Sequence, residues 1–311
     1  MSQTSYGSGQ SLRPVPQQRI VQKLDEYMSR RDIAGAQRHL LYWLEEARAA
    51  DDKRGELMLR NELVGHFRKT GDKEQAFLHA DEALSLIDEL EFGNTISAGT
   101  TYTNVGTAYN AFGEYERSLE LLSKAKTLYE SNPNTEPQLL GGLYNNMALT
   151  CVALCRYDEA DRLFHQALDI MADVEHGQLE QAITYLNMAD AAVAKSHAHA
   201  SDAAFAAAES NRGSDSGICE DMESDGCHDV VSGPNPSPSD SEIEPTIDKE
   251  CEEVVECFLD TALELLDTPS VPRDGYYAFV CEKCAPVFAY YGYFLADADL
   301  KERAKAIYER A

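Results

Sequence analysis

The chain has 311 residues, 43% of them hydrophobic and 26% charged, which is the composition of an ordinary globular protein. Its formal net charge of -27 at pH 7 repels nucleic-acid phosphates and anionic lipids, so we expect neither nucleic acid nor a membrane as partner. No run of about 18 apolar residues occurs, and the first residues lack the basic and apolar regions of a secretory signal. These features favour a cytoplasmic location.

The N-terminal part is predicted to contain a tail and a first hairpin. We expect residues 1–17 to form a disordered N-terminal tail. Residues 20–47 have the hydrophobic periodicity of two helices, with four residues on the inner side: Tyr27, Ala36, Leu40 and Trp43. This hairpin would cap the N-terminal end of a repeat array that spans residues 18–195.

Three stretches, starting near Leu63, Val105 and Met147, repeat one arrangement of small and aromatic residues at a period of about 42 positions. One column holds the turn residues Gly71, Gly113 and Cys155. Two more columns hold small residues, namely Ala76, Ser118 and Ala160, and then Ala83, Ala125 and Ala167. Small side chains are required where two helices cross at close range, so the period predicts stacked helical hairpins.

The best-matched unit, NVGTAYNAFGEYERSLELLSKA at residues 104–125, resembles the tetratricopeptide repeat family. The family pattern is a small residue, an aromatic, a turn glycine, a tyrosine and two alanines. The units at 61–84 and 146–168 match it more loosely, because Val64 and Cys155 stand where glycine is usual. The usual period is about 34 residues, so the resemblance is to a long-period type. It implies an all-α fold, a right-handed α-solenoid of antiparallel helical hairpins.

The fourth repeat is predicted to be interrupted. Residues 182–195 look like its first helix, with Asn187 in the position of Asn146. From residue 196 to 249 the chain has ten serines, four prolines and twelve acidic residues against two basic ones. Such a segment cannot bury enough apolar area to offset its ordering entropy, so we predict a long acidic disordered insertion over 196–249. Helical periodicity resumes at 250–268, which would supply the delayed second helix.

The C-terminal part, residues 250–311, is predicted to hold that second helix and a terminal hairpin over 276–311. The terminal hairpin has Pro286 in its first helix. Five of its residues fit the repeat spacing: Gly292, Leu295, Ala304, Tyr308 and Ala311.

One column of polar residues points to a binding site. The position before the small residue of each first helix holds Glu62, Asn104, Asn146 and Asn187, with Asn61 and Asn145 one position earlier. An asparagine side chain offers both a donor and an acceptor, which is what an extended peptide backbone needs. The resemblance implies that such asparagines line the concave face, so the expected peptide-binding residues are Asn104, Asn146, Asn187, Asn61 and Asn145. Alternatively, these amides satisfy the backbone of the neighbouring hairpin.

The charges near the expected groove limit its ligands. A groove that grips a terminal carboxylate needs basic residues, whereas the sequence places threonines there, at positions 100, 103 and 107. The one basic cluster near the groove consists of Arg60, Arg68 and Lys69. It is either a local basic patch or, as we interpret it, a solvated helix end.

The eight cysteines raise the alternative of structural zinc. Cys281 and Cys284 form a C-x-x-C pair, and further candidates are Cys251, Cys257, Cys219, Cys227 and His228. Zinc needs about four converging ligands, and a companion pair at comparable spacing is missing. Several cysteines lie at helix-packing positions, as reduced thiols do. We therefore expect no metal and no cofactor.

No motif of a catalytic site occurs: there is no phosphate-binding glycine loop, no G-x-S-x-G and no H-E-x-x-H. The repeats occupy most of the length, so we expect that the chain is not an enzyme. The sequence predicts a non-catalytic scaffold or adaptor that binds a protein or peptide along a groove. Two alternatives stay open, a peptide-sensing regulatory module that acts on a partner protein and a structural zinc-binding protein.

Overall fold

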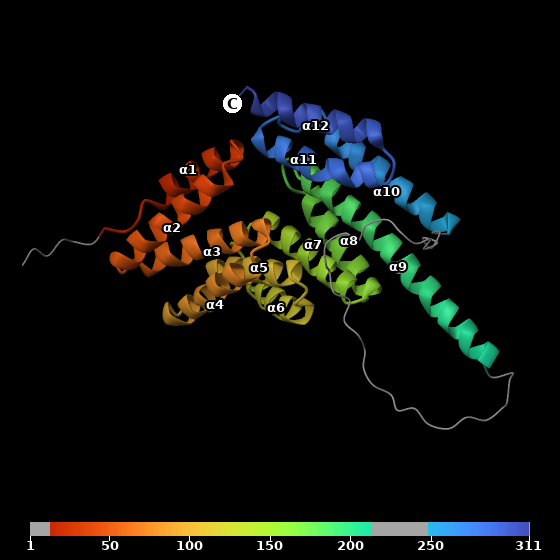
Figure 1. Ribbon diagram of the computed structural model, residues 1–311, viewed down its shortest axis with the longest axis horizontal. Helices are drawn as coiled ribbons and strands as arrows, with labels where there is room; N and C mark the ends of the chain where they lie inside the picture. Colours follow the sequence, from red (N-terminus) through yellow and green to blue (C-terminus); the bar gives the residue numbers. More distant parts are fainter. Residues whose placement is uncertain (1–12, 213–247, 311) are drawn as a thin grey trace, which may run out of the picture. The chain divides into compact units, whose positions relative to one another are not determined.

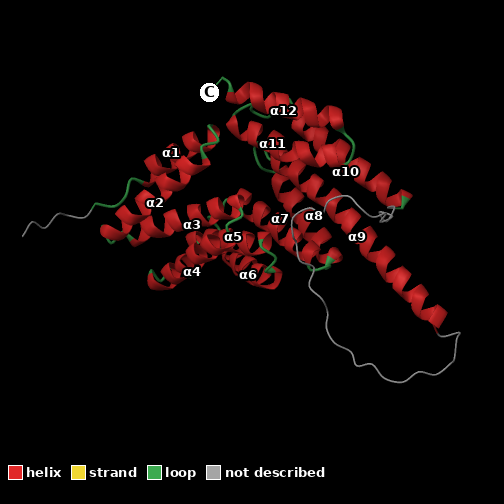
Figure 2. Ribbon diagram, viewed as in Figure 1, coloured by secondary structure: helices red, strands yellow, loops and turns green. Residues whose placement is uncertain are grey.

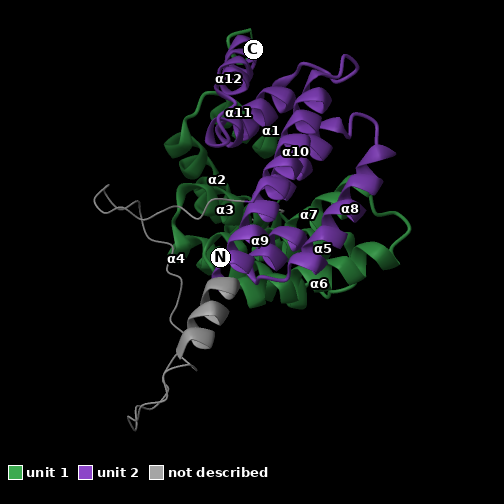
Figure 3. Ribbon diagram, turned by 90° about the vertical axis from the view of Figure 1, so that its right-hand side faces the viewer, with its two compact units in different colours: residues 1–146, 308–311 green, residues 147–307 purple. Residues whose placement is uncertain are grey.

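The computed structural model describes residues 13–212 and 248–310, which form helices and, within these ranges, no strand (Figures 1 and 2). The chain divides into two compact units, unit 1 (residues 1–146 and 308–311) and unit 2 (residues 147–307), coloured separately in Figure 3. The predicted fold class, an all-α solenoid of helical hairpins, is confirmed. In chain order the helices are α1 (Gln17–Ser29), α2 (Ile33–Ala49), α3 (Lys53–Thr70), α4 (Lys73–Glu89), α5 (Ile96–Ala111), α6 (Tyr115–Ser131), α7 (Pro137–Ala153), α8 (Tyr157–Ala172), α9 (Gln178–Arg212), α10 (Lys249–Asp267), α11 (Gly275–Tyr290) and α12 (Phe294–Tyr308).

The turns inside the hairpins share one backbone conformation. Gly71, Gly113 and Cys155, the predicted turn column, all have left-handed φ values, of 77°, 83° and 57°. Gly292 has the same conformation, with φ 84°. Glycine adopts it without steric cost, whereas a residue with a Cβ, such as Cys155, loses about 1 kcal/mol there. The turn positions predicted from the period are therefore correct.

In unit 1 each hairpin packs against the next one, so that α3 contacts α2, α4 and α5, and α5 also contacts α4 and α6. The predicted small residues lie in these contacts, where Ala76, Ala83, Ser118 and Ala125 are fully buried. The approach is close at Gly106, where an added Cβ would lie 2.9 Å from Leu122 Cδ2. Close helix crossings thus explain the repeated small residues.

Unit 1 begins earlier than the sequence predicts. Val15 belongs to the predicted tail, yet it is buried in the core, and its N–H donates to Asp52 Oδ2 at 2.9 Å. The other oxygen of Asp52 accepts from the Gly55 N–H at the start of α3. A single valine has no periodicity that could signal this contact. Residues 1–12 of the predicted tail lie outside the described residues.

In unit 2 the long helix α9 packs against α8, α10 and α11. The predicted boundary at Ser196 differs from the structure, because α9 continues to Arg212. Residues 196–212 contain seven alanines and neither glycine nor proline, so their high helix propensity extends the helix into the acidic segment. The rest of the predicted disordered insertion, residues 213–247, lies outside the described residues.

The end of unit 2 also departs from one expectation. Ala304 is buried, as its repeat position predicts, but Leu295 is 89% exposed. These two residues are nine positions apart on α12, and at about 100° per residue they lie on opposite sides of the helix. Helix α11 continues through Pro286 to Tyr290. In neither described range is any helix long and apolar enough to span a bilayer.

Candidate functional site

A groove of about 430 Å³ lies on unit 1 along α1, α3 and α5. We call it the first-helix groove, because these are the first helices of three successive hairpins. It is lined by Gln17, Arg54, Leu57, Met58, Asn61, Glu62, Phe92, Ser97, Thr100, Thr101 and Asn104.

Helical spacing places these residues on one face. On α3 the lining residues follow Arg54 after three, four, seven and eight positions, and on α5 they follow Ser97 after three, four and seven. Residues at such spacings form one stripe on a helix. The repeat aligns the stripes of α3 and α5, so the two helices together form the floor of the groove.

Hydrogen bonds join the two stripes. Asn61 Nδ2 donates to Thr101 Oγ1 at 3.0 Å, and Asn104 Nδ2 donates to Asn61 Oδ1 at 3.2 Å. Asn61 Nδ2 also donates to the carbonyl of Leu57 on its own helix, at 3.0 Å. The structure therefore brings together two of the predicted peptide-binding residues. Part of their hydrogen-bonding capacity serves the neighbouring hairpin, as the alternative interpretation proposed, although the partners are side chains.

Both asparagines keep unused capacity. Asn61 and Asn104 are half-buried, and among the described residues the side-chain oxygen Oδ1 of Asn104 accepts no hydrogen bond. An amide oxygen can accept two hydrogen bonds and an amide nitrogen can donate two. A ligand backbone in the groove could therefore still bond to this pair.

The other three predicted residues lie outside this groove. Asn145 and Asn146 are half-buried on α7, and Asn187 is half-buried on α9 in unit 2. Each of them interacts with other groups of the chain. A role for them in peptide binding stays a prediction.

The groove carries two charged side chains of opposite sign. The guanidinium of Arg54 lies over the Phe92 ring, 5.2 Å from its centroid. Burial raises the pKa of the Glu62 carboxyl above its usual range, and Asp25 raises it further, while Lys69 acts in the opposite direction. Glu62 was recognisable from its column in the repeat. Arg54 and Phe92 were missed, although Arg54 shares the helical stripe of Asn61.

Threonine hydroxyls on α5 bond to the backbone of their own helix. Thr103 Oγ1 donates to the Gly99 carbonyl at 2.9 Å, and Thr107 Oγ1 donates to the Asn104 carbonyl at 2.8 Å. Thr100 Oγ1 lies 3.2 Å from the Ile96 carbonyl and 3.1 Å from Tyr129 Oη. Arg54 is the only cation among the described residues that line the groove, which does not form a basic carboxylate clamp.

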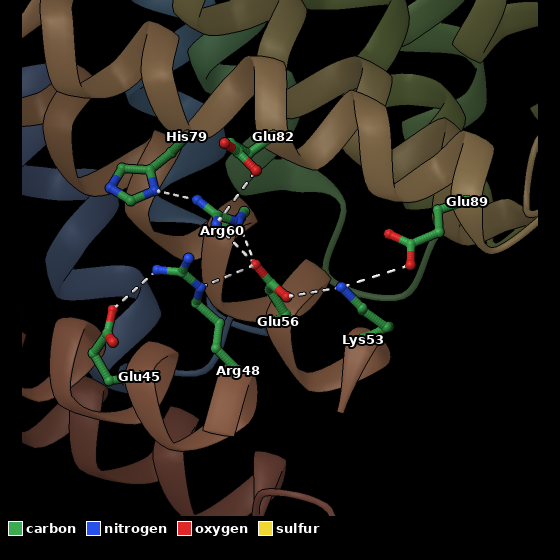
Figure 4. Close-up of polar contacts among 8 residues, drawn as sticks. All are labelled: Glu45, Arg48, Lys53, Glu56, Arg60, His79, Glu82 and Glu89. Carbon is green, nitrogen blue, oxygen red and sulfur yellow. Dashed lines mark hydrogen bonds and ion pairs between the residues drawn. The ribbon is translucent and has the colours of Figure 1, made fainter. Parts of the chain in front are cut away.

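The interpretation of Arg60 as part of a solvated basic cluster is wrong. Its side chain is buried away from solvent, and its Nη2 and Nε donate to Glu56 Oε1 at 2.8 and 3.1 Å (Figure 4). Its Nη1 lies 3.2 Å from His79 Nδ1, which accepts because a guanidinium can only donate. Arg60 is thus neither a solvated helix end nor part of a groove surface. Glu56 lies four positions earlier on the same face, and His79 comes from α4.

The buried cluster, defined as Glu56, Arg60 and His79, has a surrounding shell of charges. Lys53 lies 3.9 Å from Glu56 and 3.6 Å from Glu89, and Glu82 lies 3.6 Å from Arg60 (Figure 4). Burial, with a smaller contribution from Arg60, lowers the pKa of His79 to about 4. His79 is therefore neutral at pH 7, as an acceptor for Arg60 must be.

The cysteines of α11 do not form a metal centre with other described residues. Cys281 and Cys284 are buried, and burial raises the pKa of both thiols, to about 12 for Cys284. Metals bind the thiolate, so this environment disfavours ligation. Within residues 13–212 and 248–310 no group of three or more His, Cys, Asp or Glu side chains could hold an ion. Cys219, Cys227 and His228 lie outside the described residues.

Unit 2 has a smaller pocket, of about 170 Å³, between α8, α9 and α10. Its walls are largely apolar, with Phe164, Met188 and Phe258 among them. The Lys195 ammonium and the Asp158 carboxylate, which also line it, form an ion pair at 3.1 Å. Its one cation is thus already paired, and the pocket is smaller, so the first-helix groove is the better candidate site.

Comparison with known proteins supports the fold. No family model matches the chain, and no curated protein matches it either. Among solved structures, BtubC (BKLC) from P. vanneervenii is similar with a TM-score of 0.50 and 16% identity, over 70% of this chain and 87% of that chain. A putative kinesin light chain of Podosopora anserina with nearly identical TPR-like repeats has a TM-score of 0.39 and 15% identity, over 80% of this chain and 92% of its own. A tetratricopeptide repeat protein from Parabacteroides merdae has a TM-score of 0.38 and 14% identity, over 94% and 93%.

Proposed function

We propose that this chain, a repeat protein of the tetratricopeptide type, is a non-catalytic scaffold or adaptor that holds an extended protein segment in the first-helix groove. The observation that carries the proposal is the pair Asn61 and Asn104, joined at 3.2 Å across α3 and α5. The pair lies in the groove floor and keeps one donor, on Asn104, and acceptors on both side chains that the fold does not use.

The pair is suited to a peptide main chain. An extended segment presents carbonyl and N–H groups in alternation. Asn104 can still donate one hydrogen bond and accept two, whereas Asn61, whose two N–H groups bond to Leu57 and Thr101, can only accept one more. The bonds between Asn61, Asn104 and Thr101 hold the amides in place before a ligand arrives, which lowers the entropic cost of binding. The volume of about 430 Å³ lies within the range of ordinary ligand sites.

No hydroxyl group of the described groove lining is hydrogen-bonded to a base, whether the carboxylate Glu62 or an imidazole. The hydroxyl groups of the groove come from Ser97, Thr100 and Thr101, and no histidine or cysteine stands among its described lining residues. A serine or threonine becomes a nucleophile only next to a base. Thr101 instead donates to the Ser97 carbonyl at 3.1 Å, which is a bond within the helix. Binding without chemistry is the function that this lining supports.

The test uses short random peptides displayed on phage and selected against the full chain. Selected peptides are then synthesised, and their dissociation constants are measured by fluorescence anisotropy. The combined change Asn61→Ala and Asn104→Ala should weaken binding by about tenfold or more. The control Asn94→Ala, at an exposed loop position outside the groove, should change it less than about twofold. Equal binding by the double variant and the wild type would overturn the assignment of the groove.

A further inference from the structure

Glu62 is the one carboxylate among the described residues that line the first-helix groove. It is half-buried on α3, and within residues 13–212 and 248–310 it forms no hydrogen bond or ion pair. The positions three and four away on its helix hold Met58, Leu59, Gly65 and His66, none of which is a fixed cation. Two charges shift the pKa of Glu62: the carboxylate of Asp25 on α1, which raises it, and the ammonium of Lys69, which lowers it less.

Other carboxylates of unit 1 have partners, both the buried Glu56 and the exposed Asp81 and Glu130. Glu56 binds Arg60 at 2.8 Å, Asp81 accepts from the Tyr109 hydroxyl at 3.4 Å, and Glu130 accepts from the Tyr144 hydroxyl at 2.6 Å. A carboxylate that loses water without gaining a partner destabilises the fold. Glu62 is such a carboxylate, partly buried and without an ion pair, and it lines the first-helix groove.

From these observations we infer that the first-helix groove takes a protein segment with a lysine or arginine side chain, whose cation pairs with Glu62 beside Asp25. This inference rests on the proposed function, since it assumes that the groove is where a segment binds. The charge of the whole chain agrees with it, because a net charge of -27 attracts basic segments over long range. The nearby amides of Asn61 and Asn104 would hold the main chain on either side of that residue.

Arg54 gives the groove a direction. It lies eight positions before Glu62 on α3, which corresponds to about 12 Å along the helix axis. An extended segment rises about 3.3 Å per residue, so an acidic side chain or carbonyl about four residues from the basic one reaches Arg54. The basic residue of the ligand therefore belongs at the Glu62 end, away from the repulsion of the guanidinium.

A divalent cation is the competing occupant of the Glu62 end. Calcium takes about six to eight oxygen ligands, and two carboxylates on different helices supply too few. The two occupants differ in a simple measurement. Millimolar Mg²⁺ or Ca²⁺ should leave peptide binding unchanged apart from the effect of ionic strength, and specific displacement of the peptide by either ion would overturn the inference.

The main experiment is a double-mutant cycle with the selected peptides. We expect these peptides to be rich in lysine and arginine, and replacing one such residue by glutamine to weaken binding by about tenfold. Glu62→Gln should weaken binding of the parent peptide by a similar factor and should not weaken the glutamine peptide further. Glu46→Gln is the matched control, because it removes the same charge from an exposed position on α2 outside the groove.

The outcomes separate this inference from the proposed function. Acidic or neutral selected peptides, or equal effects of Glu62→Gln and Glu46→Gln, would overturn the pairing. Loss of binding in the Asn61 and Asn104 double variant but not in Glu62→Gln would keep the groove and reject the cation. Loss in Glu62→Gln alone would support the cation and reject the asparagine contacts. Failure to select any peptide would count against both.

Discussion

Helix α3 carries charged residues in two different settings, the buried cluster around Arg60 and the first-helix groove around Glu62. In the buried cluster the charges neutralise each other, since Arg60 binds Glu56 and His79, and Glu82 lies nearby (Figure 4). In the groove Glu62 has no such partner among the described residues, and Arg54 contacts the Phe92 ring. Charged residues of one helix can therefore have two roles: Arg60 links neighbouring hairpins, whereas Glu62 stays available to a ligand.

The largest effect should come from breaking the buried cluster. Arg60→Leu leaves the buried Glu56 carboxylate without the cation that hydrogen-bonds to it, which should lower the unfolding free energy of unit 1 by about 3 kcal/mol. Urea unfolding followed by the fluorescence of Trp43, the only tryptophan, reports on this unit because Trp43 packs against its core. Arg38→Leu, at an exposed position on α2, is the control and should cost less than about 0.5 kcal/mol. Similar losses of unfolding free energy in Arg60→Leu and Arg38→Leu would show that the buried cluster does not stabilise unit 1 in this way.

The pH dependence of unit 1 should reflect His79. Its pKa is about 4 in the fold against an ordinary 6.5, so on acidification the unfolded chain takes up this proton first. The contribution of neutral His79 to the unfolding free energy of unit 1 should be fully present above about pH 6.5. The unfolding free energy should fall by up to about 3 kcal/mol as the pH drops toward 4. His79→Asn keeps an acceptor for Arg60 and should flatten this window in the Trp43 measurement. His165→Asn, on an exposed site of unit 2, should leave it unchanged, and an unaltered slope in His79→Asn would reject the assignment.

A smaller loss is expected from the hydrogen bonds of the groove. Asn61→Ala removes the bonds to Thr101 and Asn104 but leaves no charge buried, so unit 1 should lose about 1 kcal/mol. The same urea titration measures it. A loss as large as that of Arg60→Leu would show that the asparagine pair serves the fold first, and the contrast between the two settings would disappear.

The smallest change in unfolding free energy is expected for Glu62→Gln, and it should be an increase. The pKa of Glu62 is raised, so its protonated form is favoured in the fold and its ionised form destabilises unit 1 at pH 7. Glu62→Gln should therefore raise the unfolding free energy by about 0.5 kcal/mol while weakening the binding of basic peptides. Glu56→Gln is the comparison, because it should lower stability. Equal destabilisation by both changes would mean that Glu62 has a structural partner after all.

Much of the fold could be predicted because the repeat records local steric requirements. A left-handed turn favours glycine, and a close helix crossing needs a small side chain, so Gly71, Gly113 and the column of Ala76, Ser118 and Ala160 could be recognised from spacing. The extension of α9 past Ser196 was missed because acidic and serine-rich composition outweighed the local alanine content. Three residues of the candidate site, Asn61, Glu62 and Asn104, could be recognised in the same way, through their column in the repeat.

The features that the sequence did not predict depend on contacts between helices. Arg60 resembled a surface cation in the sequence, and only its position opposite His79 of α4 shows that it is buried and paired. Arg54 and Phe92 meet in the groove although they come from different segments, so no spacing rule could connect them. Side-chain partners of this kind depend on the packing of neighbouring hairpins, which the repeat specifies only in outline.

By itself, the sequence of this protein determined the hairpins, their turns and the small residues between them, because these follow from backbone geometry within one repeat. The tertiary structure alone decided which polar groups meet and which remain unpaired. Asn61 and Asn104 join across two hairpins, while Glu62 next to Asn61 forms no ion pair with a described residue. Burial and pairing depend on what the adjacent helices bring within a few ångströms, and that distance exists only once the hairpins have packed.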